Sequence, residues 1–171
     1  MLVSQIITAQ DFMKSTGNNK VTEDFQLLLQ LSLHIIHLMS RLDRNPQEDF
    51  MFRKTVHRLI VRDPRGQDGE SLLHLSVDPK ISLTSEEFYS PFPSLAVVEI
   101  LILCGIDVNA VDRKRNTALH NSIKFLTYSE LQNEGILDCL LQNDAHIDMY
   151  NSEGQSALVL LQHQGLPVCP L

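Results

Sequence analysis

The stretch from Gly105 to His120 reads Gly-Ile-Asp-Val-Asn-Ala-Val-Asp-Arg-Lys-Arg-Asn-Thr-Ala-Leu-His, and both of its halves recur in the chain. Its closing half, Thr-Ala-Leu-His, is matched upstream by Ser-Leu-Leu-His at 71–74 and downstream by Ser-Ala-Leu at 156–158. Its opening half is matched by Leu-Leu-Gln-Asn-Asp-Ala-His-Ile-Asp at 140–148. Internal recurrence of this kind indicates a repeat architecture.

The two halves are typical of the junction between ankyrin repeats, whose period is about 33 residues. Here His74 and His120 are 46 residues apart, and Thr117 and Ser156 are 39 apart. The surplus is about 13 residues in the first repeat and about 6 in the second. We place it between the two helices of each repeat, at 78–93 and at about 125–133, where insertions form loops on one face.

The predicted fold is therefore all-α, a helical N-terminal region followed by ankyrin repeats in an α-solenoid. We divide the chain into a helical region (1–63), a repeat with an insertion between its helices (64–112), a second repeat (113–151), and a partial repeat with a tail (152–171).

Composition narrows the class of protein. Net charge is −7, and the pI of 5.4 argues against a nucleic-acid binder, which would show a basic patch and a high pI. Residues 1–66 hold nine basic and seven acidic residues, whereas residues 67–171 hold five basic and 14 acidic. None of the three cysteines forms a Cys-x-x-Cys pair, which favours reduced thiols in an intracellular protein of the cytoplasm or the nucleus. We expect no signal peptide and no membrane span.

Two helices are predicted before the repeats. Thr22 is the expected cap of the first helix, with Glu23 and Asp24 in its first turn. Its apolar residues follow the helical period but spread around the helix, so we expect it to be covered on more than one side. The periodic set is Phe25, Leu28, Leu29, Ile35, Ile36, Met39 and Leu42, and the residues that widen the face are Leu27, Leu31, Leu33 and Leu38. Further upstream, Leu2, Val3, Ile6, Ile7 and Met13 form one helical face before the break at 15–20.

The second helix begins at Asn45-Pro46, with Glu48 three residues after the cap, and ends before Asp63-Pro64. Its core face is Phe52, Val56, Leu59 and Ile60. Another face carries the candidate partner-binding residues Lys54, Arg58 and Arg62 at four-residue spacing. We interpret them either as a docking stripe for an acidic partner or as a solvated face, the latter possibility including a face turned toward the acidic half.

Each repeat supplies its own structural signals. Ser71, Thr117 and Ser156 are expected to cap the inner helices, 71–77 being the first, and its outer helix is expected at 94–103. His74 and His120 occupy the ankyrin position whose ring binds loop backbone. Arg115 and Asp144 stand where a glycine with a left-handed backbone is usual, so the second repeat should be the less stable one.

No residue pattern indicates catalysis. His34 and His37 are three apart on a helix, but no carboxylate or cysteine lies at ligand spacing, so we expect no metal site. Phosphate-binding and nucleophile motifs are absent from the sequence. We therefore expect no catalytic residue, no cofactor and no enzyme.

The insertion carries three aromatic residues, Phe88, Tyr89 and Phe92, interleaved with two prolines. Aromatic anchors on a stiff loop are typical of protein interfaces. The sequence supports equally well the alternative that these aromatic residues cap the exposed end of the ankyrin core.

A longer motif string resembles one family. It comprises Arg-Asp-Pro-Arg-Gly-x-Asp-Gly-x-Ser-Leu-Leu-His-Leu-Ser-Val-Asp at 62–78, Phe-Pro-Ser-Leu-x-Val-Val at 92–98, and Leu-Cys-Gly-x-Asp-Val-Asn at 103–109. Over about residues 45–160 this string is similar to the Fem (feminization) family, in which ankyrin repeats follow a tetratricopeptide-like segment. The segment before it, Phe-Tyr-Ser-Pro at 88–91, departs from the Gly-Arg-Tyr-Pro usual there.

The resemblance implies a substrate receptor of a cullin-RING ubiquitin ligase, with protein partners that include elongin B, elongin C and a cullin. In the family the degron pocket lies in an N-terminal ankyrin array and the elongin-binding box follows the last repeat. We expect this chain to correspond to the C-terminal portion without either. The alternative is a generic ankyrin interaction module, or a regulatory fragment without ligase function.

Overall fold

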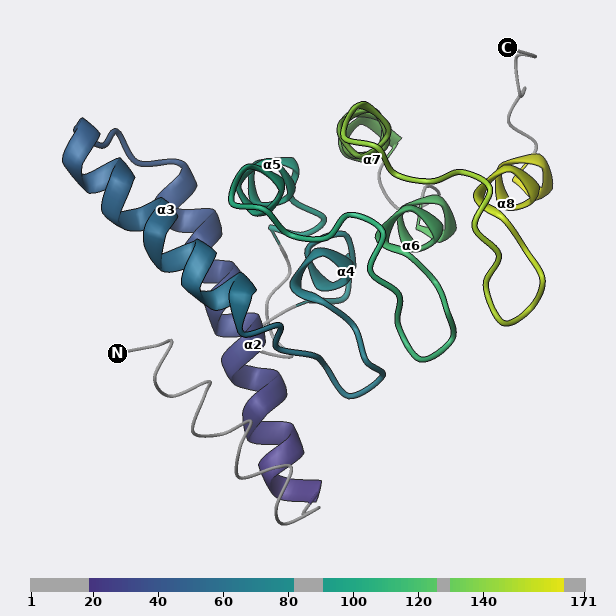
Figure 1. The fold of residues 1–171 in the computed structure, drawn as a ribbon, viewed down its shortest axis with the longest axis horizontal. Helices are drawn as coiled ribbons and strands as arrows, with labels where there is room; N and C mark the ends of the chain where they lie inside the picture. Colours follow the sequence, from purple (N-terminus) through teal and green to yellow (C-terminus); the bar gives the residue numbers. More distant parts are fainter. Residues whose placement is uncertain (1–18, 82–90, 126–129, 165–171) are drawn as a thin grey trace.

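The computed structural model of this chain describes residues 19–81, 91–125 and 130–164, and within these ranges it is helical, as predicted (Figure 1). The helices, labelled as in Figure 1, are α2 (Asn19–Ser40), α3 (Pro46–Val61), α4 (Leu72–Ser76), α5 (Leu95–Leu103), α6 (Ala118–Lys124), α7 (Glu130–Gln142) and α8 (Ala157–His163). In the described ranges the only pairing of extended backbone is an isolated bridge between Tyr150 and Ser156.

The helices form a short stack of repeats (Figure 1). The inner helices α4, α6 and α8 form one row, α5 and α7 form an outer row beside it, and the connections between repeats project away from both rows as fingers. Neighbouring helices α5 and α7 pack on each other, as do α6 and α8, while α2 covers the free flank of α4 and α5. A stack of this kind buries one continuous core, because each repeat covers its neighbour.

The second predicted helix is confirmed in detail. The Asn45 side chain accepts a hydrogen bond from the Glu48 N–H at 2.9 Å, and the Glu48 carboxylate accepts one from the Asn45 N–H at 3.2 Å, which closes a capping box with Pro46 at the first position. At the other end Asp63 has φ 46°, outside the right-handed helical region that proline disfavours in the preceding residue.

The predicted start of the first helix is wrong. The helix α2 begins at Asn19, so Thr22 lies inside it and no acidic residue is in its first turn. A hydroxyl cap is worth only about 1 kcal/mol, and no glycine or proline from 19 to 22 prevents another turn. Ile35 and Leu42, which the periodicity assigned to the core, are exposed.

The insertions lie between the helices of each pair, as predicted. The first separates α4 from α5, and the second separates α6 from α7. The range predicted for the second insertion is too long, because α7 already begins at Glu130. Part of the surplus therefore lengthens the outer helix, which has 13 residues in α7 against nine in α5.

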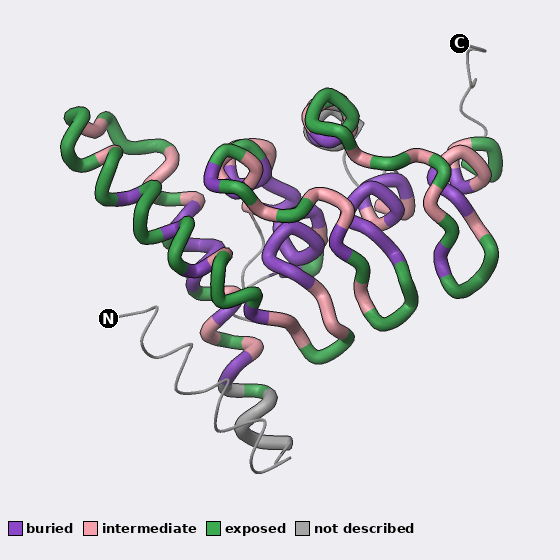
Figure 2. Tube along the Cα trace, viewed as in Figure 1, coloured by how far each residue is buried: buried purple, intermediate pink, exposed green. Residues whose placement is uncertain are grey.

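The core runs along the junction of the two helix rows (Figure 2). Side chains that are completely or almost completely buried come from every pair: Leu29 and Leu33 of α2, Leu72 and Leu73 of α4, Leu101 of α5, Leu119 and Ile123 of α6, and Ile136 and Leu140 of α7. Phe52, Val56 and Leu59 of α3 join the same core, as its periodicity predicted.

Equivalent turns of the repeats share a left-handed residue. Gly69 and Gly154 have φ 79° and 70° in two of the fingers, and the middle finger has Arg115 there with φ 60°. Likewise Gly105, with φ 89°, is matched by Asp144 with φ 62°. The expectation of a left-handed backbone at Arg115 and Asp144 is confirmed. A side chain with a Cβ is strained in this region by roughly 1–2 kcal/mol relative to glycine.

We expect Arg115→Gly to raise the free energy of unfolding by about 1 kcal/mol, because glycine relieves this strain. Urea unfolding followed by circular dichroism measures the change. Lys114→Gly is the matched control: Lys114 has no positive φ, so there the added backbone freedom of glycine should lower stability. A decrease for both variants would contradict the strain argument.

Candidate interaction surfaces

The fingers are held in place by buried histidines. The Ser71 N–H donates to His74 Nδ1 at 3.2 Å, and His74 Nε2 lies 2.8 Å from the carbonyl oxygen of Asn116 in the next finger. His120 repeats this arrangement with the carbonyls of Met149 and Gln155, at 3.1 and 3.2 Å. Because Nδ1 accepts, Nε2 must carry the proton and donate. The predicted structural role of both rings is confirmed.

Burial lowers the pKa of both His74 and His120, and the backbone carbonyl that each contacts opposes this only in part. The rings therefore stay neutral at neutral pH. Around Asn116 further polar contacts join the fingers: its Oδ1 accepts from Lys124 Nζ at 3.0 Å and from the Asn151 amide at 3.1 Å. These contacts fix the finger backbone and leave the finger tips exposed.

The outer surface of α3 carries the predicted basic residues. Lys54, Arg58 and Arg62 are all exposed, and no ion pair involving them occurs in the described residues. Three large apolar side chains lie on the same outward side and are more than half exposed, namely Phe50, Met51 and Val61. We call these six residues the basic–apolar face of α3. Its cations are solvated in this chain, so they do not neutralise the acidic ankyrin half.

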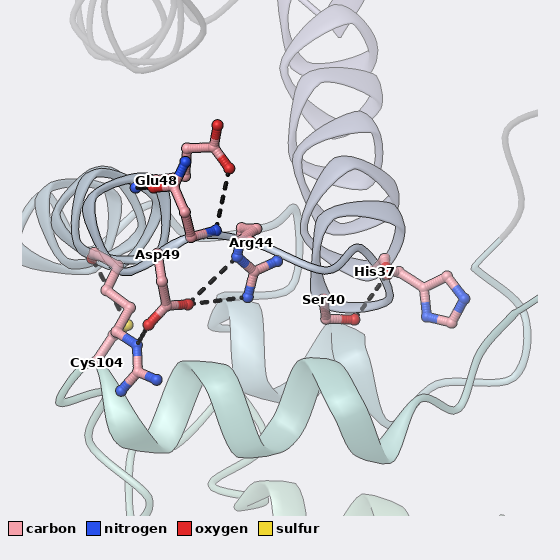
Figure 3. Close-up of polar contacts among 8 residues, drawn as sticks. His37, Ser40, Arg44, Glu48, Asp49 and Cys104 are labelled. Atoms are coloured by element: carbon pink, nitrogen blue, oxygen red, sulfur yellow. Dashed lines mark hydrogen bonds and ion pairs between the residues drawn. The ribbon is translucent and has the colours of Figure 1, made fainter.

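The opposite side of α3 is anchored by a polar cluster that the sequence did not reveal (Figure 3). Asp49 pairs with Arg44 at 3.1 Å and with Arg53 at 2.7 Å, and the Arg44 guanidinium lies 4.3 Å from the centre of the Phe52 ring. The end of α5 also contacts this helix, since Cys104 Sγ lies 3.6 Å from the Arg53 carbonyl oxygen. The ion pairs thus brace the start of α3, the Cys104 contact joins this helix to the end of α5, and the basic–apolar face points away from the repeats.

Of the three aromatic residues predicted in the insertion, the structure places only one. Phe88 and Tyr89 lie outside the described residues. Phe92 is only 4% exposed and packs edge-on against His34, with ring centres 5.0 Å apart. The prediction of Phe92 as a partner-binding residue is therefore wrong, because its ring belongs to the core beneath α2.

His34 and His37 serve the same packing. His37 Nδ1 lies 2.9 Å from Ser94 Oγ at the start of α5, and burial lowers the pKa of this histidine. His34 Nδ1 lies 2.9 Å from the carbonyl oxygen of Gln30 one turn earlier, so that nitrogen donates to the backbone. Neither ring is part of a group of three potential metal ligands in the described residues.

Taken together, the fold and the exposed faces define an ankyrin-repeat scaffold for protein–protein interaction. The sequence comparisons agree with this class. Fem-1 homolog A of Danio rerio is 33% identical over 140 residues, which is 82% of this chain and 22% of that protein. Fem-1 homolog A of Bos taurus is 29% identical over 162 residues (95% of this chain, 23% of that protein), and fem-1 homolog C of Xenopus laevis 32% over 137 residues (80% and 21%).

The chain therefore belongs to the Fem family, and it spans about a fifth of the length of these relatives. No family model matches the sequence. Among the described helices, none has both the length and the apolar character to cross a membrane.

Burial lowers the pKa of His74 and His120 in the folded chain, whereas histidines of the unfolded chain keep their ordinary pKa near 6.5. As the pH falls toward that value, the unfolded chain therefore binds more protons than the folded chain. We therefore expect the urea midpoint to fall between pH 7.5 and pH 5.5. Burial raises the pKa of Asp78 above its ordinary value, and this acts in the opposite direction because the folded chain then holds that proton more tightly than the unfolded chain. The double variant His74→Gln/His120→Gln should be less stable at pH 7.5 and show a shallower pH dependence. An unchanged slope would show that other groups cause it.

The burial of Phe92 can be tested against an exposed ring of the same type. We expect Phe92→Ala to lower the free energy of unfolding by roughly 3–5 kcal/mol, because it empties a filled core site. Phe50→Ala removes an exposed ring and should change stability by less than about 0.5 kcal/mol. Equal effects in urea unfolding would place Phe92 at the surface.

Proposed function

We propose that this chain is a non-enzymatic scaffold segment of a Fem-type substrate receptor of cullin-RING ubiquitin ligases, the role that the family resemblance implies. The observation that carries the proposal is the match to fem-1 homologs over 80–95% of the chain. The buried residues that join one repeat to the next are the kind of framework such a scaffold needs. Elongin B, elongin C and a cullin are then the proposed partners of the assembly, with the cytoplasm or nucleus as its location.

Within this role we propose the basic–apolar face of α3 as a docking surface for an acidic protein partner. Three cations four residues apart supply charge attraction along one line, and Phe50, Met51 and Val61 beside them supply apolar area. An amphipathic helix with acidic residues flanking an aliphatic row matches both features. The proposed division of the chain, at about residues 63, 112 and 151, leaves this face in the helical region and outside the repeats.

A chimera tests the scaffold role. The region of Bos taurus fem-1 homolog A that matches this chain is replaced by the chain itself, and substrate ubiquitination is measured in a reconstituted reaction with elongin B, elongin C and a cullin. We expect activity within about tenfold of the parent protein, because an equivalent scaffold holds the degron pocket and the elongin-binding box of the parent in the same relative position. A chimera that melts like its parent but lacks activity would contradict the proposal. It would favour the alternative, a generic ankyrin interaction module.

The docking face is tested in the same chimera by charge reversal. Lys54→Glu/Arg58→Glu should reduce ubiquitination at least tenfold, with a larger effect at low salt, because both residues lie on the proposed face. Arg113→Glu/Lys114→Glu changes the net charge equally at exposed finger positions and should leave activity unchanged. If both double variants lose the same amount of ubiquitination activity, the basic–apolar face is not the docking surface, whereas the proposed scaffold role is unaffected.

A further inference from the structure

The outward face of α2 carries an aliphatic stripe that the described part of the chain leaves exposed. Its residues are between 37% and 63% exposed and comprise Leu27, Leu31, Ile35 and Leu38, with Leu42 just past the helix end. Steps of three and four residues place them along one side of the helix. The opposite side of α2 lies against the repeats and is formed by the buried residues Phe25, Leu29, Leu33 and Ile36. Contiguous exposed apolar surfaces of this kind mark binding sites.

Opposite charges stand at the two ends of the stripe. From Phe25 to Ser40 no residue is charged, whereas Glu23 precedes the stripe and Arg41 follows it. Both are exposed, and neither forms an ion pair with another described residue. The Arg41 N–H still bonds to the Leu38 carbonyl oxygen at 3.2 Å, so the helical turn continues to this residue. From Glu23 to Arg41 the chain makes about five turns of 3.6 residues, which places both charges on the same flank of the stripe.

We propose that the stripe is the interface of an antiparallel homodimer, in which α2 packs lengthwise on α2 of a second copy. A two-fold axis requires that the contacting pairs be symmetric about one point of the helix. Leu27 then lies opposite Leu38 of the second copy, and Leu31 lies opposite Ile35. Glu23 lies opposite Arg41. All three pairs are centred within about half a residue of the midpoint between Ser32 and Leu33, as the symmetry demands.

The charges favour a second copy in this orientation. A two-fold axis between antiparallel helices keeps the charged flank of one helix beside the charged flank of the other. Each end of the seam therefore closes with a pair of Glu23 and Arg41, one from each copy. Parallel helices would instead bring like charges together, which costs binding energy. The uncharged centre of the seam buries no unpaired charge.

The size of the seam predicts a weak dimer. The repeats extend from one side of α2 only, so they leave the stripe open to a lengthwise approach (Figure 1). A single helix pair belongs to the small class of interfaces, below about 1,200 Å² in total, which is typical of weak complexes. We therefore expect a dissociation constant of about 1–100 μM. The dimer uses no residue of the basic–apolar face of α3, so it is independent of the proposed ligase role.

Sedimentation equilibrium of the full chain from about 1 to 300 μM tests the proposal. The parent chain should pass from monomer to dimer within this range. Leu31→Asp/Ile35→Asp should remain monomeric, because it places carboxylates at the centre of the seam. The matched control is Leu103→Asp/Leu141→Asp, which changes two comparably exposed leucines on α5 and α7 and should leave the dimer intact.

A charge exchange tests the orientation without altering the apolar stripe. Glu23→Arg and Arg41→Glu should each raise the dissociation constant by about tenfold at low salt, because like charges then meet at both ends of the seam. An equimolar mixture of these two variants should dimerise like the parent chain, since opposite charges face each other again. Misfolding of either variant could not produce this recovery.

Three results would overturn the proposal. A parent chain that stays monomeric over the whole range would show that something other than a second copy covers the stripe. Equal dissociation by the two aspartate pairs would place the interface elsewhere on the molecule. Mixing the two charge variants without recovery would exclude the antiparallel arrangement of the helices.

Discussion

The repeats depend on one buried side chain that joins each inner helix to the next finger. His74 uses both ring nitrogens, one to accept from the start of its own helix and one to donate to the Asn116 carbonyl. Such a ring must be neutral and in one tautomer, so its orientation is fixed and the finger is fixed with it. His120 passes the same constraint to the last finger. At α8 the equivalent position, three residues after the capping Ser156, is Val159, and the series of histidine links ends there.

This constraint explains where the chain is free to vary. Positions that join repeats are buried and polar, and a change there leaves an unpaired group in the core. The side chains at the finger tips and on the outer side of α3 do not join one repeat to the next, because they reach solvent. The stack tolerates even a strained backbone at Arg115, held by the Arg115 N–H bond to the Asp112 carbonyl at 3.0 Å and by the finger contacts around it. Binding specificity can therefore differ among proteins that share these links.

Features set by the repeat period could be predicted from the sequence, and features set by contacts between distant segments could not. The caps at Ser71, Thr117 and Ser156 and the left-handed backbone at Arg115 follow from local motifs that recur in each unit. The burial of Phe92 depends on His34, which lies 58 residues earlier and carries no signal of that contact. The same holds for the side of α3 that faces the repeats. Its helical period identifies Phe52 as core, but not that Arg44 stacks on that ring. The helical period predicts that Lys54, Arg58 and Arg62 share one face of α3. That this face points to solvent follows only from the packing of α3 on α5.

The helix α2 has a more specific role than a terminal cap of the stack. A repeat in a solenoid cannot bury its apolar face alone, and α2 supplies to α4 and α5 the cover that a preceding repeat would give. A cap that faced only the repeats would be polar on its outer side. Here the outer side is aliphatic from Leu27 to Leu38, so α2 is apolar on two opposite sides. A helix with that pattern belongs between two layers. The side of α2 that faces away from the ankyrin stack is therefore a second apolar surface of this helix, formed by Leu27, Leu31, Ile35 and Leu38.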